Sequence, residues 1–180
     1  MKKIKYLVVA ISLMFASACD KADSVIFEDK STAIGISKIG WTITASSFSA
    51  DEAPNGTAEK LIDNDSKTYW HTNYAVVTPY PHWVLIDMKK ENKMISVGIT
   101  NRYAATPNSV GMKKFKLEGS NDGTTFSSLG EFNFAISNDS QNFPVSSDKA
   151  YRYLKLTALE PQKAGTNHTF LGEIDVFGVK

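Results

Sequence analysis

The chain has 180 residues, of which 42% are hydrophobic and 22% are charged. This composition is typical of one globular domain and excludes collagen, coiled coils and polytopic membrane proteins. The formal net charge of +1 provides no strong field to attract nucleic acid or an anionic bilayer, and the single cysteine excludes a disulfide framework and cysteine-based zinc clusters.

Residues 1–18 have the layout of a secretory signal peptide. Three lysines precede an apolar run at residues 7–15, and the small residues Ala-Ser-Ala follow it. A membrane-spanning helix needs about twenty apolar residues, so this run is too short for a permanent transmembrane anchor. Cys19 comes next and resembles the lipidated cysteine of a bacterial lipobox. We predict that Cys19 is diacylated; the alternative is a plain signal peptide followed by a free cysteine.

Lipidation of Cys19 would determine where the protein works. Two or three acyl chains give stable anchoring, whereas one chain holds only marginally. We expect a lipid-anchored protein at the outer membrane and cell surface. Asp20, directly after the cysteine, keeps the inner membrane as the alternative location. Without the three leader lysines, 17 basic side chains face 19 acidic ones, so the mature chain carries about −2. Residues 19–39 are predicted to be the anchor and a tether; residues 25–27 could instead form a first edge strand.

After Gly40 the sequence changes to short runs of β-branched and aromatic residues, separated by Asn, Asp, Gly and Ser. Several runs alternate apolar and charged side chains, and only residues 58–62 suggest a helical turn. We predict an all-β fold over residues 40–180, an antiparallel β-sandwich of the jelly-roll type, with Trp41, Trp70 and Trp83 in the core. The predicted strands are 41–48, 82–88, 95–102, 113–119, 126–134, 141–145, 151–158 and 173–179.

The sequence lacks the common catalytic and nucleotide-binding motifs. It has no Gly-x-Ser-x-Gly elbow, Walker loop, Gly-x-Gly-x-x-Gly fingerprint or His-Glu-x-x-His helix. Its three histidines, His71, His82 and His168, are too dispersed to predict a metal cage from spacing. We therefore expect no enzyme activity; two carboxylates at glycoside-hydrolase spacing would be the exception, because sequence separation says nothing about distance in space.

Residues 58–74, AEKLIDNDSKTYWHTNY, crowd oxygen donors into a tight turn. These donors are the side chains of Asp63, Asp65, Ser66 and Thr68. Hard cations take carboxylate, hydroxyl and carbonyl oxygens, and a tight turn can aim several carbonyls inward. From the residues alone, a cation site and an Asx-type turn that bonds only its own backbone are equal alternatives.

Five stretches of the sequence occur in an order shared with one domain family. They are AEKLIDNDSKTYWHT, PHWVLIDM, KKFKLEGSNDGTTF, YRYLKL and LGEIDVFG. The sequence resembles the coagulation factor V/VIII type C domain, or discoidin domain, and more closely carbohydrate-binding module family 32, which is attached to bacterial sialidases and galactose oxidase. The resemblance covers residues 40–180 and implies a jelly roll with one structural calcium.

The resemblance also implies which residues hold the calcium. The implied ligands are the carbonyl oxygens of Lys60, Asp65 and Gly172, the carboxylates of Asp63 and Glu173, and the oxygens of Thr68. Such a shell would clip the turn at residues 60–68 to the start of the last strand. We expect it to stabilise the fold and to take no direct part in ligand contact.

A sugar site in the loops at one end of the sandwich is implied as well. The histidine of the Thr-x-Trp-His segment matches His71, and an aromatic platform three residues later matches Tyr74. An arginine at a strand end matches Arg102, and a polar residue before the final strand matches Asn167. An aromatic ring can cover the apolar face of galactose while neighbouring groups bond its hydroxyls.

Two departures from the family pattern affect this site. Pro54 occupies the aligned position of an acidic residue, so Glu52 or Asp51 is expected to replace it. Tyr74 stands where the most similar family members have tryptophan, which leaves the preferred sugar open. Tyr74 and the loop after it could also form an exposed apolar tip, and Arg102 a plain surface ion pair.

We expect a non-catalytic, calcium-stabilised glycan-binding lipoprotein that recognises galactose-type or amino-sugar termini. Its partners would be oligosaccharides or glycoconjugates, the membrane through the lipid anchor, and a larger envelope glycan-uptake complex if it does not act alone. The alternative is a protein or phospholipid adhesion module of the discoidin type. Protruding apolar loops without a concave polar pocket beside His71 would favour that alternative.

Overall fold

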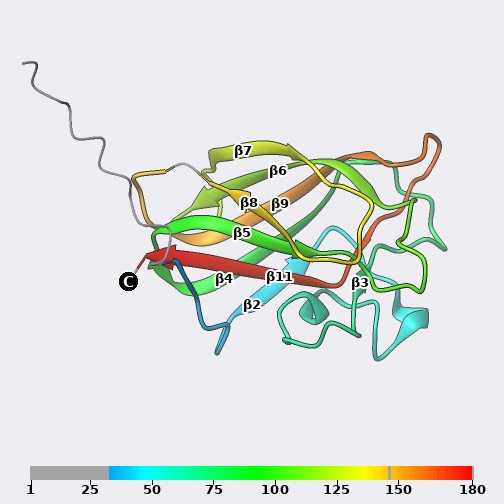
Figure 1. The fold of residues 1–180 in the computed structure, drawn as a ribbon, viewed down its shortest axis with the longest axis horizontal. Coiled ribbons are helices and arrows are strands. Elements are labelled where there is room, and N and C mark those ends of the chain that lie inside the picture. Colours follow the sequence, from blue (N-terminus) through cyan, green and yellow to red (C-terminus); the bar gives the residue numbers. More distant parts are fainter. Residues whose placement is uncertain (1–32, 146, 180) are drawn as a thin grey trace, which may run out of the picture.

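The structure, a computed structural model, describes residues 33–145 and 147–179. Two antiparallel sheets pack face to face, and successive strands pass repeatedly from one sheet to the other (Figure 1). This arrangement confirms the predicted antiparallel β-sandwich of the jelly-roll type. The predicted signal peptide, Cys19 and the first part of the predicted tether lie outside the described residues.

The larger sheet has the strand order β2-β4-β9-β6-β7, and the second sheet has the order β1-β11-β5-β8. The larger sheet contains β2 (Thr42–Ala45), β4 (His82–Asn92), β9 (Tyr151–Pro161), β6 (Met112–Ser120) and β7 (Ser127–Asn133). The second contains β1 (Ala33–Gly35), β11 (Glu173–Val179), β5 (Met94–Thr100) and β8 (Gln141–Pro144). All eight predicted strands are present.

Four short elements complete the fold. Strands β3 (Trp70–His71) and β10 (Phe170–Leu171) form a two-stranded sheet. The 3-10 helices η2 (Ala50–Glu52) and η3 (Ala58–Leu61) precede β3, and η3 corresponds to the expected helical turn. In Figure 1 these elements lie at the end of the sandwich opposite the C-terminus. That end carries the loops in which the sugar site is expected.

The core lies between the two large sheets and follows the alternation of the strands. On β4, Val84, Ile86 and Met88 are at most 1% exposed. Trp41 and Trp70 are buried, as predicted. Trp83 is only partly buried, out of phase with those core positions, and the Lys155 ammonium lies 5.5 Å from its ring centroid. The prediction of Trp83 in the core is wrong because adjacent strand residues point to opposite faces of a sheet.

Residues 33–39, which the sequence assigned to the tether, belong to the folded domain. Strand β1 pairs with β11, with Ala33 opposite Val179. The Lys38 side chain is 5% exposed and pairs with Glu173 and Asp175. A tether would leave this ammonium group in water, so the folded domain includes at least residues 33–39.

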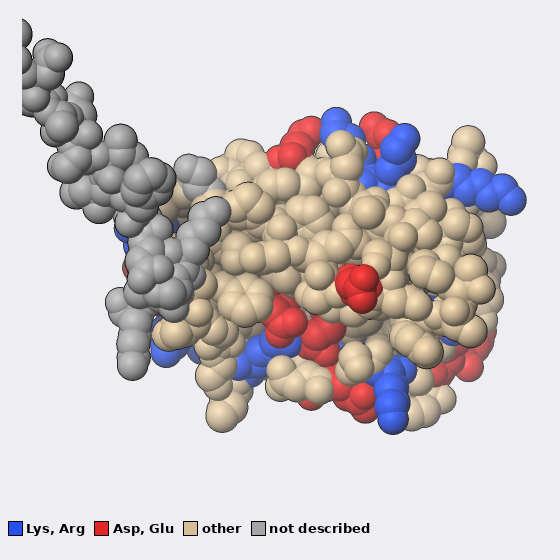
Figure 2. All heavy atoms as spheres, in the orientation of Figure 1, with Lys and Arg blue, Asp and Glu red and all other residues tan. Residues whose placement is uncertain are grey.

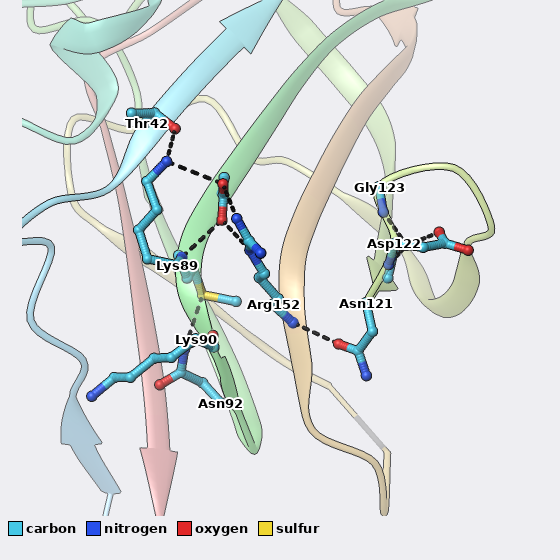
Figure 3. A network of polar contacts seen from close by, with 11 residues as sticks. Thr42, Lys89, Lys90, Asn92, Asn121, Asp122, Gly123 and Arg152 are labelled. Carbon is cyan, nitrogen blue, oxygen red and sulfur yellow. Dashed lines mark hydrogen bonds and ion pairs between the residues drawn. The ribbon is translucent and has the colours of Figure 1, made fainter.

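A polar network fixes three strands of the larger sheet on its outer side (Figure 3). Arg152 on β9 donates two hydrogen bonds to the Asp87 carboxylate on β4, at 2.8 and 2.9 Å. Lys89 donates its backbone N–H to Asp87 at 2.8 Å and its ammonium to the Thr42 hydroxyl on β2 at 2.8 Å. The network lies where the pairing of β4 with β9 shifts register, and therefore secures an irregular part of the sheet.

The surface and the secondary structure agree with the composition. Figure 2 shows basic and acidic side chains interspersed on the face drawn, without a continuous basic patch. Within residues 33–145 and 147–179, the structure contains no helix of the length and apolar character needed to cross a membrane.

Candidate functional site

The turn between η3 and β3 is held by side chains that bond their own backbone. The Asp65 N–H donates to Asp63 Oδ1 at 3.0 Å, and the Lys67 N–H donates to Asp65 Oδ1 at 2.9 Å. Asn64 between them has a φ of 62°, in the left-handed region that asparagine tolerates. These are the bonds of an Asx turn.

Oxygens of this turn converge on the hydroxyl of Thr68. Its Oγ1 lies 3.0 and 2.9 Å from the two carboxylate oxygens of Asp63, 2.9 Å from the Asp65 carbonyl oxygen and 3.4 Å from the Lys60 carbonyl oxygen. A hydroxyl has one hydrogen to donate. Four of the predicted calcium ligands therefore meet at this hydroxyl, and the Lys60 ammonium pairs with the Asp63 carboxylate beside it, at 3.2 Å.

Glu173, at the start of β11, lies close to this turn. Its side chain is 8% exposed, and Oε1 pairs with Lys38. Oε2 is buried and has no partner among the described residues. Burial raises the pKa of Glu173, Lys38 opposes this shift, and the charges of Asp175 and Asp63 raise the pKa further. Strand β11 also packs against η3, the element that precedes the turn.

The remaining predicted ligand, Gly172, connects β10 to β11. A Cβ atom at this position would lie 2.7 Å from the carbonyl oxygen of Asn101, so only glycine fits without a shift of the backbone. Within the described part of the chain, no cluster of three or more His, Cys, Asp or Glu side chains is arranged to hold a metal ion. A cation at this turn would therefore depend on carbonyl and hydroxyl oxygens in addition to Asp63 and Glu173.

A second polar cluster is organised around Glu52, the last residue of η2. Glu52 Oε2 lies 2.7 Å from His71 Nδ1, and Glu52 Oε1 accepts a bond of 3.4 Å from the Tyr69 hydroxyl. Arg102, just after β5, donates from Nη1 to Oε1 at 3.5 Å, and its guanidinium carbon lies 3.7 Å from the Tyr69 ring centroid. Of the two acidic candidates, Glu52 and not Asp51 makes these contacts.

The protonation of His71 follows from this environment. Burial lowers the pKa of His71, and the hydrogen bond to Glu52 partly opposes the shift. The ring is therefore neutral at pH 7, with its proton on Nδ1, where it donates to Glu52. Nε2 is left as an acceptor, and it is buried without a partner among the described residues.

Three aromatic rings surround the imidazole of His71. The ring centroids of Tyr74, His168 and Phe170 lie 5.0, 5.3 and 5.5 Å from that of His71. Tyr74 is 46% exposed, whereas Phe170 is buried. A ligand can reach Nε2 only after one of these rings moves, and Tyr74 is the most exposed of the three.

A cavity of about 370 Å³ opens beside Tyr74. Its walls include Asn73 and Tyr74 after β3, and Asn167 and His168 before β10. The Asn167 backbone carbonyl accepts a bond of 2.8 Å from His82 Nε2, which fixes this loop while the Asn167 side chain remains exposed. The cavity thus joins the two loops that flank the His71 cluster.

The structure brings all five predicted sugar-contact residues to one end of the sandwich. Glu52 contacts both His71 and Arg102. Tyr74 packs beside His71, and Asn167 lines the adjoining cavity. No sequence pattern indicated that Tyr69, His168 and Phe170 belong to this cluster. Tyr69 lies inside the Thr-Tyr-Trp-His segment, and His168 follows Asn167. Their position next to predicted site residues in the sequence could have indicated these two.

Comparison with known proteins gives the relationship of this chain. Residues 42–171 match the F5/8 type C domain family. A sialidase from Micromonospora viridifaciens is 26% identical over 129 residues, which is 69% of this chain and 19% of the sialidase. The chain therefore spans about a fifth of the length of that relative.

Several solved structures share the fold. A CBM32 module of a Clostridium perfringens family 89 glycoside hydrolase, in complex with GalNAc-β-1,3-galactose, is 26% identical, with a TM-score of 0.71 over 81% of this chain and 100% of the module. The C-terminal domain of a chitobiase from Bacteroides fragilis is 28% identical, with a TM-score of 0.69 over 81% of this chain and 98% of that domain. The family 32 module of NanJ from C. perfringens, in complex with galactose, is 21% identical, with a TM-score of 0.66 over 81% of this chain and 98% of that module.

These relatives include carbohydrate-binding modules, and the sialidase is an enzyme of which this chain resembles one part. The chain belongs to the F5/8 type C domain family, as a discoidin-type module similar to family 32 carbohydrate-binding modules.

Proposed function

We propose that this protein is a non-catalytic glycan-binding module that recognises galactose-type or amino-sugar termini. The observation that supports it most is the cluster of Glu52, His71 and Arg102 beside the exposed Tyr74 ring, at the mouth of a cavity. GalNAc-β-1,3-galactose in the complex of a similar module supports the sugar class.

Each group of the cluster offers one kind of sugar contact. The Arg102 side chain is 30% exposed and makes one long bond to Glu52, so most of its N–H groups are available to hydroxyls. His71 Nε2 offers a buried acceptor. Tyr74 presents a ring that can cover the C–H face of the sugar once it has moved away from His71. Such a shallow site is expected to bind one sugar with a Kd of about 0.1–1 mM.

The cluster has features of binding and not of hydrolysis. Glu52 is the carboxylate that the cluster uses, and His71 and Arg102 both engage it. Glycoside hydrolases need two facing carboxyl groups, one of which carries a proton. Both oxygens of the Glu52 carboxylate are engaged by neighbouring side chains, and this supports a binding role.

We propose further that calcium stabilises the fold at the turn of residues 60–68. The converging oxygens around Thr68 and the orphaned, buried Oε2 of Glu173 fit a hard cation, which takes carboxylate, hydroxyl and carbonyl ligands. Asp63, Thr68, Glu173 and the carbonyl groups of Lys60, Asp65 and Gly172 would hold it. The cation would neutralise the carboxylates and tie the turn to β11.

The proposed envelope location rests on the sequence of residues 1–20. A diacylated Cys19 would hold the protein on the outer membrane at the cell surface, alone or within a larger glycan-uptake complex. Strand β1 pairs with the last residues of β11, at the end of the sandwich opposite β3 (Figure 1). An anchor on this side would direct the sugar site away from the membrane. Many copies on one surface would compensate for weak single-site binding.

The experiment is a glycan array probed with the purified protein in the presence of calcium. Binding to galactose- or GalNAc-terminated glycans that His71→Ala and Arg102→Ala abolish, with melting temperatures unchanged, is the expected result. An array without binding would overturn the proposal.

The exposed Val76 and Val77, at 62% and 73%, are the feature that favours the adhesion alternative. Against it stands the cavity beside Tyr74, which is concave and has the polar residues Asn73, Asn167 and His168 in its lining. Binding to phosphatidylserine vesicles in place of glycans, lost on Val76→Asp, would establish the adhesion role.

A further inference from the structure

The cavity beside Tyr74 extends beyond the contacts expected for a single terminal sugar. Its volume of about 370 Å³ falls within the range of about 300–1,000 Å³ that small-molecule sites occupy. One wall is the loop of Asn73 to Val77, and the opposite wall is the loop of Lys163 to His168, with Val110 between them. A glycan whose galactose unit lies at the His71 cluster can place a substituent of that unit here.

Hydrogen bonds hold both walls at their bases before any ligand arrives. Thr72 and Thr169, next to the two loops, exchange bonds of 3.0 Å from the Thr72 N–H and 2.9 Å from the Thr169 N–H. The Tyr80 hydroxyl donates to the His168 carbonyl at 3.1 Å, and His82 bonds the Asn167 carbonyl. A preorganised cavity of this kind loses little entropy when it binds a ligand.

Two side chains of the cavity, Asn73 and Lys163, offer hydrogen-bond donors to a ligand. Asn73 Oδ1 already accepts the N–H groups of Ala75 and Val76, at 3.0 and 3.2 Å, which leaves the Asn73 amide hydrogens for a ligand. Lys163 is the one charged residue in the lining, apart from the titratable His168, and no acidic side chain lines the cavity. Among the described residues, no carboxylate lies within ion-pair distance of the Lys163 ammonium.

The charge of the cavity differs from that of the neighbouring cluster. There, the charge of Arg102 is balanced by Glu52. In the cavity, the ammonium group of Lys163 has no such counter-charge. We propose that the cavity is a second subsite that binds an oxyanion carried by the glycan, a carboxylate or a sulfate ester, with Lys163 as the residue that selects it. This proposal rests on the proposed glycan-binding function and defines its ligand class as anionic glycans.

Isothermal titration calorimetry tests the subsite. Lactose and GalNAc-β-1,3-galactose are the neutral references, and the 3′- and 6′-isomers of sulfated and of sialylated lactose are the anionic probes. At least one anionic probe should bind about three- to tenfold more tightly than lactose, the gain expected of one partly exposed charge-assisted contact. The gain should shrink from 50 to 500 mM NaCl because salt screens the contact. Comparison of the sulfated with the sialylated probes shows whether the subsite prefers a sulfate ester or a carboxylate.

Lys163→Met should remove the gain and leave the affinity for lactose unchanged, and Lys163→Arg should retain the gain. Lys90→Met is the matched control, because Lys90 is an exposed lysine near the far end of β4 (Figure 3). The subsite is refuted if no anionic probe exceeds lactose, or if the gain survives Lys163→Met. Binding of the neutral references without an anionic gain refutes only this inference, whereas failure of every probe refutes the proposed function as well.

Discussion

Replacing Lys38 by methionine tests whether residues 33–39 are part of the folded domain. The Lys38 side chain is 5% exposed and lies between the carboxylates of Glu173 and Asp175. The Glu173 side chain is 8% exposed. The Asp175 side chain is 38% exposed, and its Oδ1 lies 2.7 Å from the Lys38 ammonium. Methionine keeps most of the apolar stem and removes the ammonium group. The buried Glu173 carboxylate then has no compensating charge among these partners.

The size of the effect follows from burial. Breaking a buried ion pair by removing one partner costs about 3–5 kcal/mol, because the other charge stays buried. Asp175 adds little, since water already screens it. A domain of this size loses about 2–4 °C in melting temperature for each kcal/mol. We therefore expect Lys38→Met to lower the melting temperature by about 6–20 °C in EDTA, measured by circular dichroism. Protonation of Glu173, whose pKa burial already raises, limits the loss.

The control is Lys116→Met, the same substitution in a more exposed pair. Lys116 is 35% exposed and lies 2.9 Å from Glu118, so its loss should cost less than about 1 kcal/mol. A loss for Lys38→Met no larger than that for Lys116→Met would refute the reasoning, and would return residues 33–39 to the tether.

Three further predictions follow from the turn, the platform and the sheet. Calcium at about 100 times its Kd should stabilise the protein by about 2.7 kcal/mol, seen as a melting temperature higher than that in EDTA. Asp63→Asn should abolish this response, and an equal response in the variant would contradict the proposed ligand set. Tyr74→Trp should bind galactose-type glycans at least as tightly as the wild type and Tyr74→Ala at least tenfold more weakly, measured by calorimetry, because the platform loses its ring; equal affinities would remove Tyr74 from the site. The Arg152 guanidinium and Lys89 hold the pKa of Asp87 far below its ordinary 3.8, so the stability it contributes is present above pH 4 and lost as the pH falls below that value; a urea-unfolding series from pH 7 to pH 2.5 should show a smaller acid loss for Asp87→Asn than for the wild type.

Sequence periodicity was sufficient for most of the fold. The eight longer strands were predicted because alternating side chains mark a half-buried sheet. Strands β3 and β10 have two residues each, too few to show a period. Strand β1 has the sequence Ala-Ile-Gly with all three residues exposed, so no apolar face marks it. Trp83 was misplaced because an aromatic in a strand does not reveal which face it occupies.

The candidate site could be predicted as a set of residues and not as a geometry. Resemblance to a family pointed to His71, Tyr74 and Arg102. The structure shows that Glu52 joins His71, 19 residues further along the chain, to Arg102, 50 residues further along. The contact of Lys38 with Glu173 spans 135 residues and carries no local pattern. Contacts of this kind depend on the closure of the sandwich, which periodicity does not encode.

Calorimetric titration of the wild type and His71→Ala with GalNAc-β-1,3-galactose tests the central claim most directly. A wild-type Kd of about 0.1–1 mM, weakened about tenfold or more in His71→Ala at an unchanged melting temperature, is the predicted result, because the variant loses the Nε2 acceptor and the partner of Glu52. Equal affinity in the two proteins, or no heat of binding in the wild type, would contradict it.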